Sequence, residues 1–146
     1  MPRISGGGWL TVVYGPSVEA GKQAFLDEIR ERELHSLLSG PCVICGDFNM
    51  IYKAEDKNNS RLNLRVMCRF RRLLDDTALT ELHLQGKFTW RKERLHPTLE
   101  CIDHAFASIE WLEYFSPITY AACRWIARTM RRSSCRCPPC NDQIYS

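Results

Sequence analysis

A continuous apolar run from Cys42 to Phe48 constrains the fold more than any other feature of the chain. Short apolar runs bounded by turn residues are typical of buried strands. Gly40-Pro41 precedes this run, and a polar loop at 52–63 follows it. We therefore predict a buried strand over Cys42–Phe48.

Other stretches of the chain alternate between strand and helix patterns. The expected elements are strands at 9–14, 42–48, 88–90 and 102–107, helices at 18–38 and 64–74, and a polar hairpin at 91–97. Ser17 can cap the first helix. The second helix offers five apolar residues to the core: Leu64, Met67, Phe70, Leu73 and Leu74. Its arginines, Arg65, Arg69 and Arg72, lie along another face. The alternation predicts a layered α/β domain.

Composition indicates a globular protein, because 45% of the 146 residues are hydrophobic and 25% are charged. The net charge of +3 is too small to identify a partner. No apolar run approaches the roughly 18 residues that span a bilayer, and the first residues lack the charged-then-apolar order of a signal peptide. We expect an intracellular protein that is neither secreted nor membrane-bound, with the nucleus as one compatible compartment.

Eight cysteines raise the alternative of a zinc site. Cys42 and Cys45 form a C-x-x-C, but residues three apart on a strand point to opposite faces and cannot share one metal. Cys135, Cys137 and Cys140 lie in a turn-like segment about 90 residues further on, and zinc sites usually have a spacing of roughly 12 to 20 residues. Reduced thiols that behave as small apolar residues are the favoured interpretation.

Gly46-Asp47-Phe48-Asn49, at the end of the predicted buried strand, is the first candidate for chemistry. Alternation places Asp47 and Asn49 on one face and turns Phe48 into a core layer. A carboxylate there can accept a proton from water or hold hydrated Mg²⁺, and an adjacent amide can donate to a phosphate oxygen. Asp and Asn at a strand end are also common turn formers, so the tetrapeptide alone is a weak signal.

Several separated motifs strengthen the signal. Val12–Pro16, Ile44–Met50, Phe88–Trp90 and Ile102-Asp103 occur in the order and rough spacing of the endonuclease/exonuclease/phosphatase family, which the chain resembles. Runs at 54–59 and 93–99 make it similar, more closely, to the endonuclease domain of plant LINE-type non-LTR retrotransposons. The resemblance covers residues 7–130. It implies two mixed β-sheets packed face to face with helices outside, and Mg²⁺-assisted hydrolysis of DNA phosphodiesters.

The resemblance also implies roles for particular residues. Asp47 would position or deprotonate the attacking water, and Asn49 would bind the phosphate and support Asp47, so both are candidate metal-site residues. Tyr14 would offer its hydroxyl to the phosphate, although an aromatic residue capping a strand is an equal alternative. Asp103 would orient a histidine.

The hairpin region is the expected contact with DNA. Thr89 and Trp90 resemble the family residues that meet the DNA groove, and Arg91 is a candidate for a phosphate contact. Trp90 is equally interpretable as a core residue. A solvated charged turn is the commoner explanation for a run such as Arg91, Lys92 and Arg94.

Two departures from the family pattern predict an inactive remnant. The family's metal-binding Glu and an Asn come from early strands, and this chain is expected to begin too late to contain them. The family also ends its catalytic set with Ser-Asp-His, and no such tripeptide follows Asp103. His104 cannot replace that histidine, because neighbouring residues on a strand face opposite ways.

Residues 131–146 form an irregular tail outside the partial domain at 7–130. When 132–139 are back-translated and shifted by one base, they can read Asp-His-His-Ala-Gly-Ala-Pro-Leu, which is close to the family's ending, so a frameshift is one hypothesis for the tail. Two other functions stay open: a fragment that binds nucleic acid without cleaving it, and a zinc-stabilised structural fragment. The oligomeric state is not predicted.

Overall fold

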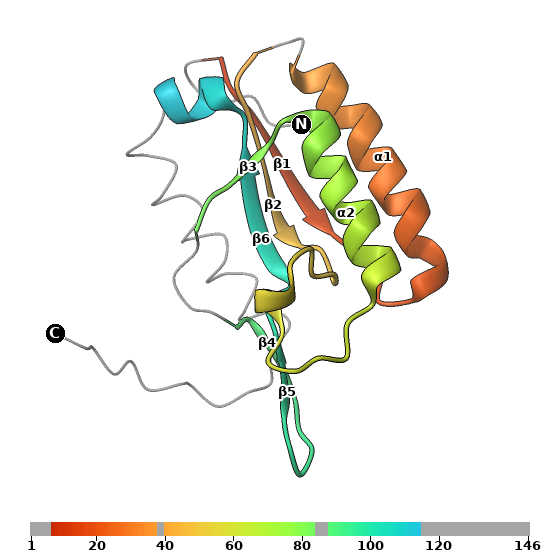
Figure 1. Ribbon diagram of the computed structural model, residues 1–146. Helices are drawn as coiled ribbons and strands as arrows, with labels where there is room; N and C mark the ends of the chain where they lie inside the picture. The colour runs from red at the N-terminus through yellow and green to blue at the C-terminus, as the bar shows by residue number, and fades with distance from the viewer. Residues whose placement is uncertain (1–6, 38–39, 84–87, 115–146) are drawn as a thin grey trace, which may run out of the picture.

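The computed structural model describes residues 7–37, 40–83 and 88–114. Its elements are β1 (Trp9–Tyr14), α1 (Glu19–Leu37), β2 (Cys42–Asp47), the 3₁₀ turn η1 (Ala54–Asp56), α2 (Leu64–Thr77), β3 (Thr80–Glu81), β4 (Trp90–Lys92), β5 (Thr98–Glu100) and β6 (Asp103–Ala107) (Figure 1). The buried strand predicted from Cys42 is confirmed, because every residue of β2 is buried.

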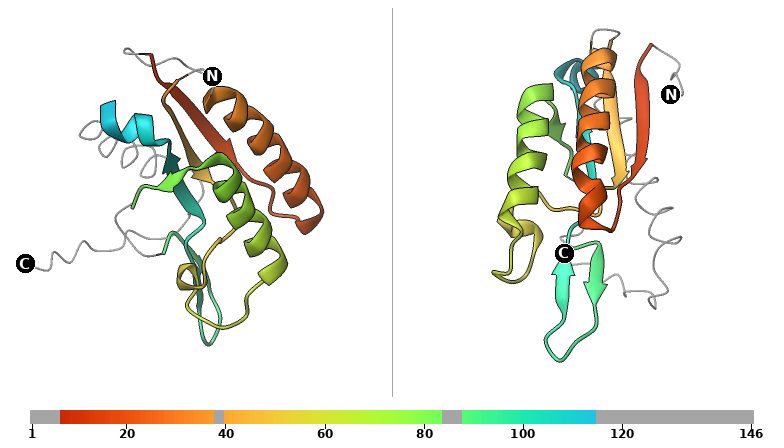
Figure 2. Two further views of the ribbon diagram at one scale, coloured as in Figure 1. Left: turned by 45° about the horizontal axis from the view of Figure 1, so that its top comes forward. Right: turned by 90° about the vertical axis from the view of Figure 1, so that its right-hand side faces the viewer.

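The strands form a four-stranded sheet in the order β1-β2-β6-β3 and a two-stranded sheet of β4 and β5. β1 runs parallel to β2, whereas β6 is antiparallel to both β2 and β3. Helices α1 and α2 cover one face of the larger sheet, and the β4–β5 hairpin projects beyond one end of it (Figures 1 and 2). The mixed α/β class predicted from the sequence is confirmed.

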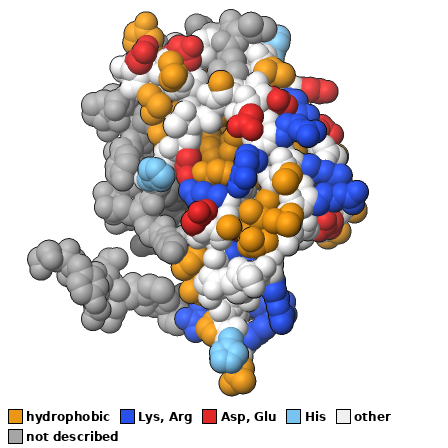
Figure 3. Space-filling model, viewed as in Figure 1, with side chains coloured by type: hydrophobic (Ala, Val, Ile, Leu, Met, Phe, Trp, Pro, Cys, Tyr) orange, Lys and Arg blue, Asp and Glu red, His pale blue; other side chains and the backbone are white. Residues whose placement is uncertain are grey.

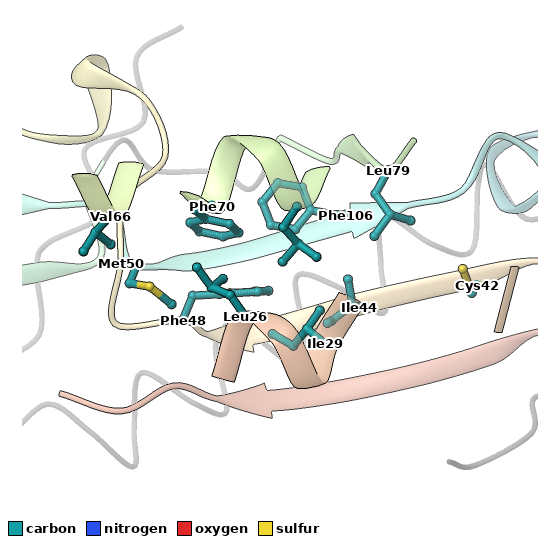
Figure 4. Packing of buried hydrophobic residues seen from close by; sticks show 11 residues of the cluster. Leu26, Ile29, Cys42, Ile44, Phe48, Met50, Val66, Phe70, Leu79 and Phe106 are labelled. Carbon is teal, nitrogen blue, oxygen red and sulfur yellow. The ribbon is translucent and has the colours of Figure 1, made fainter. Parts of the chain in front are cut away.

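The helix-side core lies between the larger sheet and the two helices. Figure 4 shows side chains from α1, α2, β2 and β6 meeting in this cluster. Phe48, which follows β2 and is 1% exposed, stacks on Phe70 at 5.1 Å between ring centroids and meets Phe106 edge-on at 5.5 Å. These rings hold the end of β2 against α2 and β6, so the segment that carries the candidate site is fixed from the helix side.

Local hydrogen bonds set the limits of α2. The Asn63 side chain accepts a bond from the Val66 backbone amide at 3.2 Å, and Ala78 ends the helix in the left-handed region at φ 52°. The helix runs to Thr77, beyond the predicted end at 74. Leu64 was wrongly predicted to reach the core: it is 63% exposed, because it lies in the first turn on the solvent side of the helix.

Strand boundaries near the hairpin differ from the prediction. The strand expected at 88–90 begins only at Trp90 and pairs with β5, which was not predicted, and β3 was also missed. Thr89 lies in a bend, because its hydroxyl accepts hydrogen bonds from the backbone amides of Ile102 and Asp103 at the start of β6. The first helix begins at Glu19 rather than 18. Leu38 and the cysteines of the tail lie outside the described residues.

Within residues 7–37, 40–83 and 88–114, no helix is long and apolar enough to cross a membrane.

Candidate active site

Three predicted site residues lie side by side at one end of the larger sheet. The register pairs Tyr14 with Asp47 across β1 and β2, and Asp47 with Asp103 across β2 and β6. Paired residues in a sheet project from the same face. Val43 and Cys45, on this same side of β2, pack in a second cluster away from the helices. Tyr14, Asp47 and Asp103 therefore form one row on the sheet face opposite α1 and α2.

Asp47 occupies the centre of this row and is 5% exposed. Burial raises the pKa of its carboxyl, a hydrogen bond from the Asn49 amide lowers it, and the nearby charge of Asp103 raises it. The net pKa shift is upward. A carboxyl with this environment gains from a cation placed beside it, because the cation offsets both the lost hydration and the repulsion between the two carboxylates.

Asn49 fixes the turn that follows Asp47. Its backbone lies in the left-handed region at φ 50°, which asparagine tolerates better than most residues. Its backbone amide donates to Asp47 Oδ1 at 2.8 Å, whereas its side-chain Nδ2 donates to the Gly15 carbonyl at 2.6 Å. The main chain of Asn49, and not its side chain, thus orients the carboxylate, and the side chain ties the ends of β1 and β2 together.

Two glycines allow β1 and β2 to approach closely beside the row. A Cβ on Gly15 would lie within 3.0 Å of the Phe48 carbonyl oxygen, and a Cβ on Gly46 would do the same with the Val13 carbonyl oxygen. Gly46 also has φ +142°, which disfavours other residues. Sequence reasoning had not assigned a role to either glycine. Their close approach depends on tertiary packing, so no local pattern revealed it.

Tyr14 is the exposed member of the row, at 71%. Its phenol ring lies at the edge of the larger sheet, beside two buried carboxylates. The hydroxyl is thus accessible to a phosphate that approaches from solvent, whereas an aromatic residue acting only as core would be covered.

The three predicted substrate-contact residues have different surroundings. The Thr89 hydroxyl accepts bonds from the backbone amides of Ile102 at 3.0 Å and Asp103 at 3.2 Å, so it positions the start of β6. Trp90 packs partly buried against a third cluster of Ile51, Met67 and Ile102. Arg91 is exposed and pairs with Glu93, with Nε and Oε1 2.7 Å apart. Of the three, only Arg91 is exposed.

His104 lies on the helix side of the sheet, as predicted. It is 1% exposed and stacks on Phe106 with ring centroids 5.6 Å apart. Its Nε2 is 3.1 Å from the Met50 carbonyl oxygen, and its Nδ1 is 3.6 Å from Glu81 Oε1. The ring therefore connects β6 to the loop after β2 and cannot reach the row on the other face.

Glu81 is the centre of a polar cluster that sequence reasoning missed. It accepts bonds from the Tyr52 hydroxyl and from Lys53 Nζ, the latter at 2.5 Å. Burial alone would raise its pKa, but the interaction with His104 and the bonds from Lys53 and Tyr52 outweigh burial and lower the pKa to about 2. A lone Glu in a short strand gives no signal in the sequence, because its partners lie far away along the chain.

The described residues contain no group of three or more His, Cys, Asp or Glu side chains arranged to hold a metal. Asp47, Asp103 and Asn49 nevertheless supply oxygen donors of the kind that Mg²⁺ prefers. This donor set fits the ion in chemical type but leaves the carboxylate ligation incomplete. Cys42 and Cys45 pack in different clusters on opposite faces, so they cannot share a zinc ion, and the other candidate ligands, Cys135, Cys137 and Cys140, lie outside the described residues.

A protein-family model matches most of the chain. No curated protein matches the sequence. Residues 3–118 match the model of the Endonuclease/Exonuclease/phosphatase family, a group of nuclease- and phosphatase-type hydrolases that are generally metal-dependent and act on nucleic acids. Because the match covers most of the chain, this protein belongs to the endonuclease/exonuclease/phosphatase family.

Proposed function

We propose that this chain carries half of a Mg²⁺-dependent DNA endonuclease site of the LINE retrotransposon type and does not cleave DNA by itself. The observation that carries the proposal is the row of Tyr14, Asp47 and Asp103 on one sheet face, with Asn49 beside it. The family membership supplies the reaction class, which is hydrolysis of a phosphodiester bond.

Each residue of the row has a role that follows from its position. Asp47, with its raised pKa, would hold the attacking water and accept its proton. The exposed Tyr14 hydroxyl would donate to a phosphate oxygen as charge develops there. Asn49 uses one amide hydrogen on Gly15 and retains another for the phosphate. When bound between Asp47, Asn49 and the substrate, Mg²⁺ would stabilise charge on the phosphate oxygens.

The same geometry supports the absence of catalysis. Mg²⁺ releases its waters reluctantly, and two carboxylates with one amide oxygen hold it weakly without further ligands. On the described part of the chain, no histidine shares the face of Asp47, since His104 lies on the helix side. Losing one preorganised donor typically costs about 2.7 to 4 kcal/mol of transition-state stabilisation. A site that lacks both a firmly held Mg²⁺ and a histidine should show almost no activity.

DNA is the proposed substrate because the basic hairpin projects from the end of the sheet that bears the row. Arg91, Lys92 and Arg94 lie in or next to β4 and would contact backbone phosphates. Thr89 would act indirectly by holding Asp103, and Trp90 would support the base of the hairpin from the core.

The LINE-type origin is supported by the two sequence runs at 54–59 and 93–99, which come into contact in the fold. Asn58 Nδ2 donates to the Pro97 carbonyl at 2.9 Å, and the Leu99 amide donates to Asn58 Oδ1 at 2.9 Å. Two runs that carry one resemblance thus form one structural unit. The nucleotide sequence around the reading frame tests this origin. Reverse-transcriptase codons downstream and an in-frame Asp-His codon pair after a one-base shift are expected, and unrelated flanking genes would contradict the proposal.

Paramagnetic Mn²⁺ tests whether Asp47, Asn49 and Asp103 bind a metal, and this test does not depend on catalytic activity. Mn²⁺ prefers the same oxygen ligands as Mg²⁺ and broadens the NMR signals of nearby amides. Titration should broaden the signals of Asn49 and Asp103 first, with weak affinity, and Asp47→Asn should abolish the effect. Asp27→Asn, which removes a carboxylate on α1, is the matched control and should change nothing. Uniform broadening, or broadening that survives Asp47→Asn, would refute the metal site.

Plasmid nicking tests the second half of the proposal. In Mg²⁺, the unmodified chain should nick supercoiled DNA no faster than buffer. A chimaera that supplies the family's Asn, Glu and Ser-Asp-His should nick it, and Asp47→Ala in that chimaera should abolish cleavage. Strong Mg²⁺-dependent nicking by the unmodified chain, lost in Asp47→Ala, would show that the described row is sufficient for catalysis and that this part of the proposal is wrong.

A further inference from the structure

Two exposed arginines and one half-buried arginine lie along one side of α2. Arg65, Arg69 and Arg72 follow one another at intervals of four and three residues, so they lie along one stripe of the helix. We call them the α2 arginine stripe. The opposite face of α2 buries Val66, Met67, Phe70, Leu73 and Thr77. At 1.5 Å per residue, the stripe extends over about 10 Å of helix.

Five other lysine and arginine side chains that the structure describes have carboxylate partners, whereas the arginines of the stripe form no such pair. Arg30 pairs with Asp27 and Asp76, and Arg32 with Glu28. Lysines and arginine elsewhere are paired in the same way: Lys53 with Glu81, Lys57 with Glu100 and Arg91 with Glu93. Within the described residues, no carboxylate forms an ion pair with any arginine of the stripe.

The start of α2 lies near the base of the basic hairpin. Met67 of α2 and Leu62 before it pack in one cluster with Trp90 of β4, so the first turns of α2 lie against the base of the hairpin. Arg61, which is exposed, precedes α2 in this region. Figure 3 shows Lys and Arg side chains gathered over the helical layer and again over the hairpin. Basic side chains thus lie in two groups, one over the helical layer and one over the hairpin, and a polyanion could contact both.

We propose that the α2 arginine stripe is a second nucleic-acid surface, which binds the phosphate backbone of duplex DNA outside the catalytic row. Guanidinium groups suit this partner, because one planar guanidinium can donate two parallel hydrogen bonds to the oxygens of a phosphate. A membrane surface fits less well. Helices that lie on membranes insert their apolar face, and the apolar face of α2 is buried in the core. DNA binding by this surface does not depend on catalysis, so this inference goes beyond the proposed endonuclease site.

Fluorescence anisotropy with a labelled 20-base-pair duplex tests the proposal on the full chain. The titrations are made in EDTA, so failure of the metal site at Asp47 cannot affect the outcome. R65Q/R72Q should weaken binding by roughly tenfold and reduce the slope of log affinity against log salt by about 2, because two phosphate contacts are lost. K22Q/R32Q, which removes the same charge from α1, should change the affinity by less than about threefold. Equal losses in both variants, or none in R65Q/R72Q, would refute a local site.

Cys68 provides a second measurement on the unaltered protein. Its thiol is exposed and lies on α2 three residues after Arg65 and four before Arg72. Saturating duplex should slow the alkylation of Cys68 severalfold, as followed by mass spectrometry of its peptide, and 0.5 M salt should restore the rate. An unchanged rate would overturn the proposal whatever the variants show. Phosphatidylserine vesicles that protect Cys68 when DNA does not would identify a membrane surface and would equally overturn it.

Discussion

The substitution Glu81→Gln removes a carboxylate charge at the point where β3, the loop after β2 and β6 meet. Glu81 lies in β3, its side chain is 17% exposed, and it receives bonds from Tyr52 and Lys53 of the loop after β2. His104 of β6 approaches the same carboxylate at 3.6 Å. The substitution keeps the shape of the side chain but withdraws the negative charge from Lys53. We expect a large and pH-dependent loss of stability.

The magnitude follows from the pKa of Glu81, which falls from 4.5 to about 2 on folding. This difference is about 2.5, and each unit corresponds to about 1.4 kcal/mol, so the ionised carboxylate stabilises the fold by about 3 kcal/mol at neutral pH. Because the folded pKa is the lower one, this stability is complete above pH 4.5 and is lost as the pH falls toward 2. Burial raises the pKa values of Glu33, Asp47 and Asp56, which gives the opposite pH dependence, but these carboxyls are present in both proteins.

Urea denaturation followed by circular dichroism at pH 5.5, 4.0 and 3.0 measures the effect. The unfolding free energy of the wild type should fall over this range more steeply than that of Glu81→Gln, and the difference between the two proteins should shrink by about 2 kcal/mol. Glu28→Gln, at an exposed pair on α1, is the control and should follow the wild type. Parallel pH profiles for wild type and Glu81→Gln would show that the bonds to Glu81 do not lower its pKa.

Three further substitutions test how the core and the site are held, each by urea denaturation. Phe48→Ala should cost about 3 to 5 kcal/mol, because its ring is 1% exposed among other aromatic rings, whereas Leu95→Ala, at a residue 94% exposed, should cost nothing measurable; similar costs would contradict the core assignment. Gly46→Ala should prevent folding or cost several kcal/mol, because the added Cβ meets backbone within 3.0 Å, whereas Gly21→Ala in α1, where a Cβ meets only the Pro16 side chain at 3.2 Å, should cost far less; a stable Gly46→Ala would refute this close approach. Thr89→Val should cost about 1 to 3 kcal/mol by leaving two backbone amides without their acceptor, and Thr89→Ser should retain stability; equal values for the two would mean that the hydroxyl bonds contribute little.

Period-2 alternation explains which features the sequence predicted well. It placed Phe48 in the core and Asp47 away from it, and it separated Cys42 from Cys45 and Asp103 from His104; the structure confirms these placements. Alternation within one strand is a local property, so it survives whatever the strand packs against. The roles of these residues in hydrolysis remain predictions.

Features that depend on distant partners were not predictable in this way. The start of β4 at Trp90 follows from the Thr89 hydroxyl, whose two donors lie 13 and 14 residues later. The polar cluster around Glu81 joins residues that are 28 and 29 positions apart. Leu64 was misplaced because its apolar character was taken as a sign of burial, whereas the first turn of a helix often leaves one such residue in solvent.

The alternation also separates what holds the fold from what carries the chemistry. Asp47 precedes Phe48, and Asp103 precedes His104, so each of these two aspartates has a neighbour that is buried on the helix side. That side is closed by stacked rings and by the bond between His104 and the Met50 carbonyl, which needs neither a metal nor a substrate. Substitutions on the face that bears Asp47 and Asp103 should therefore leave these contacts intact. The contacts that hold Asp47 and Asp103 in register are thus separate from the sheet face on which these two side chains lie.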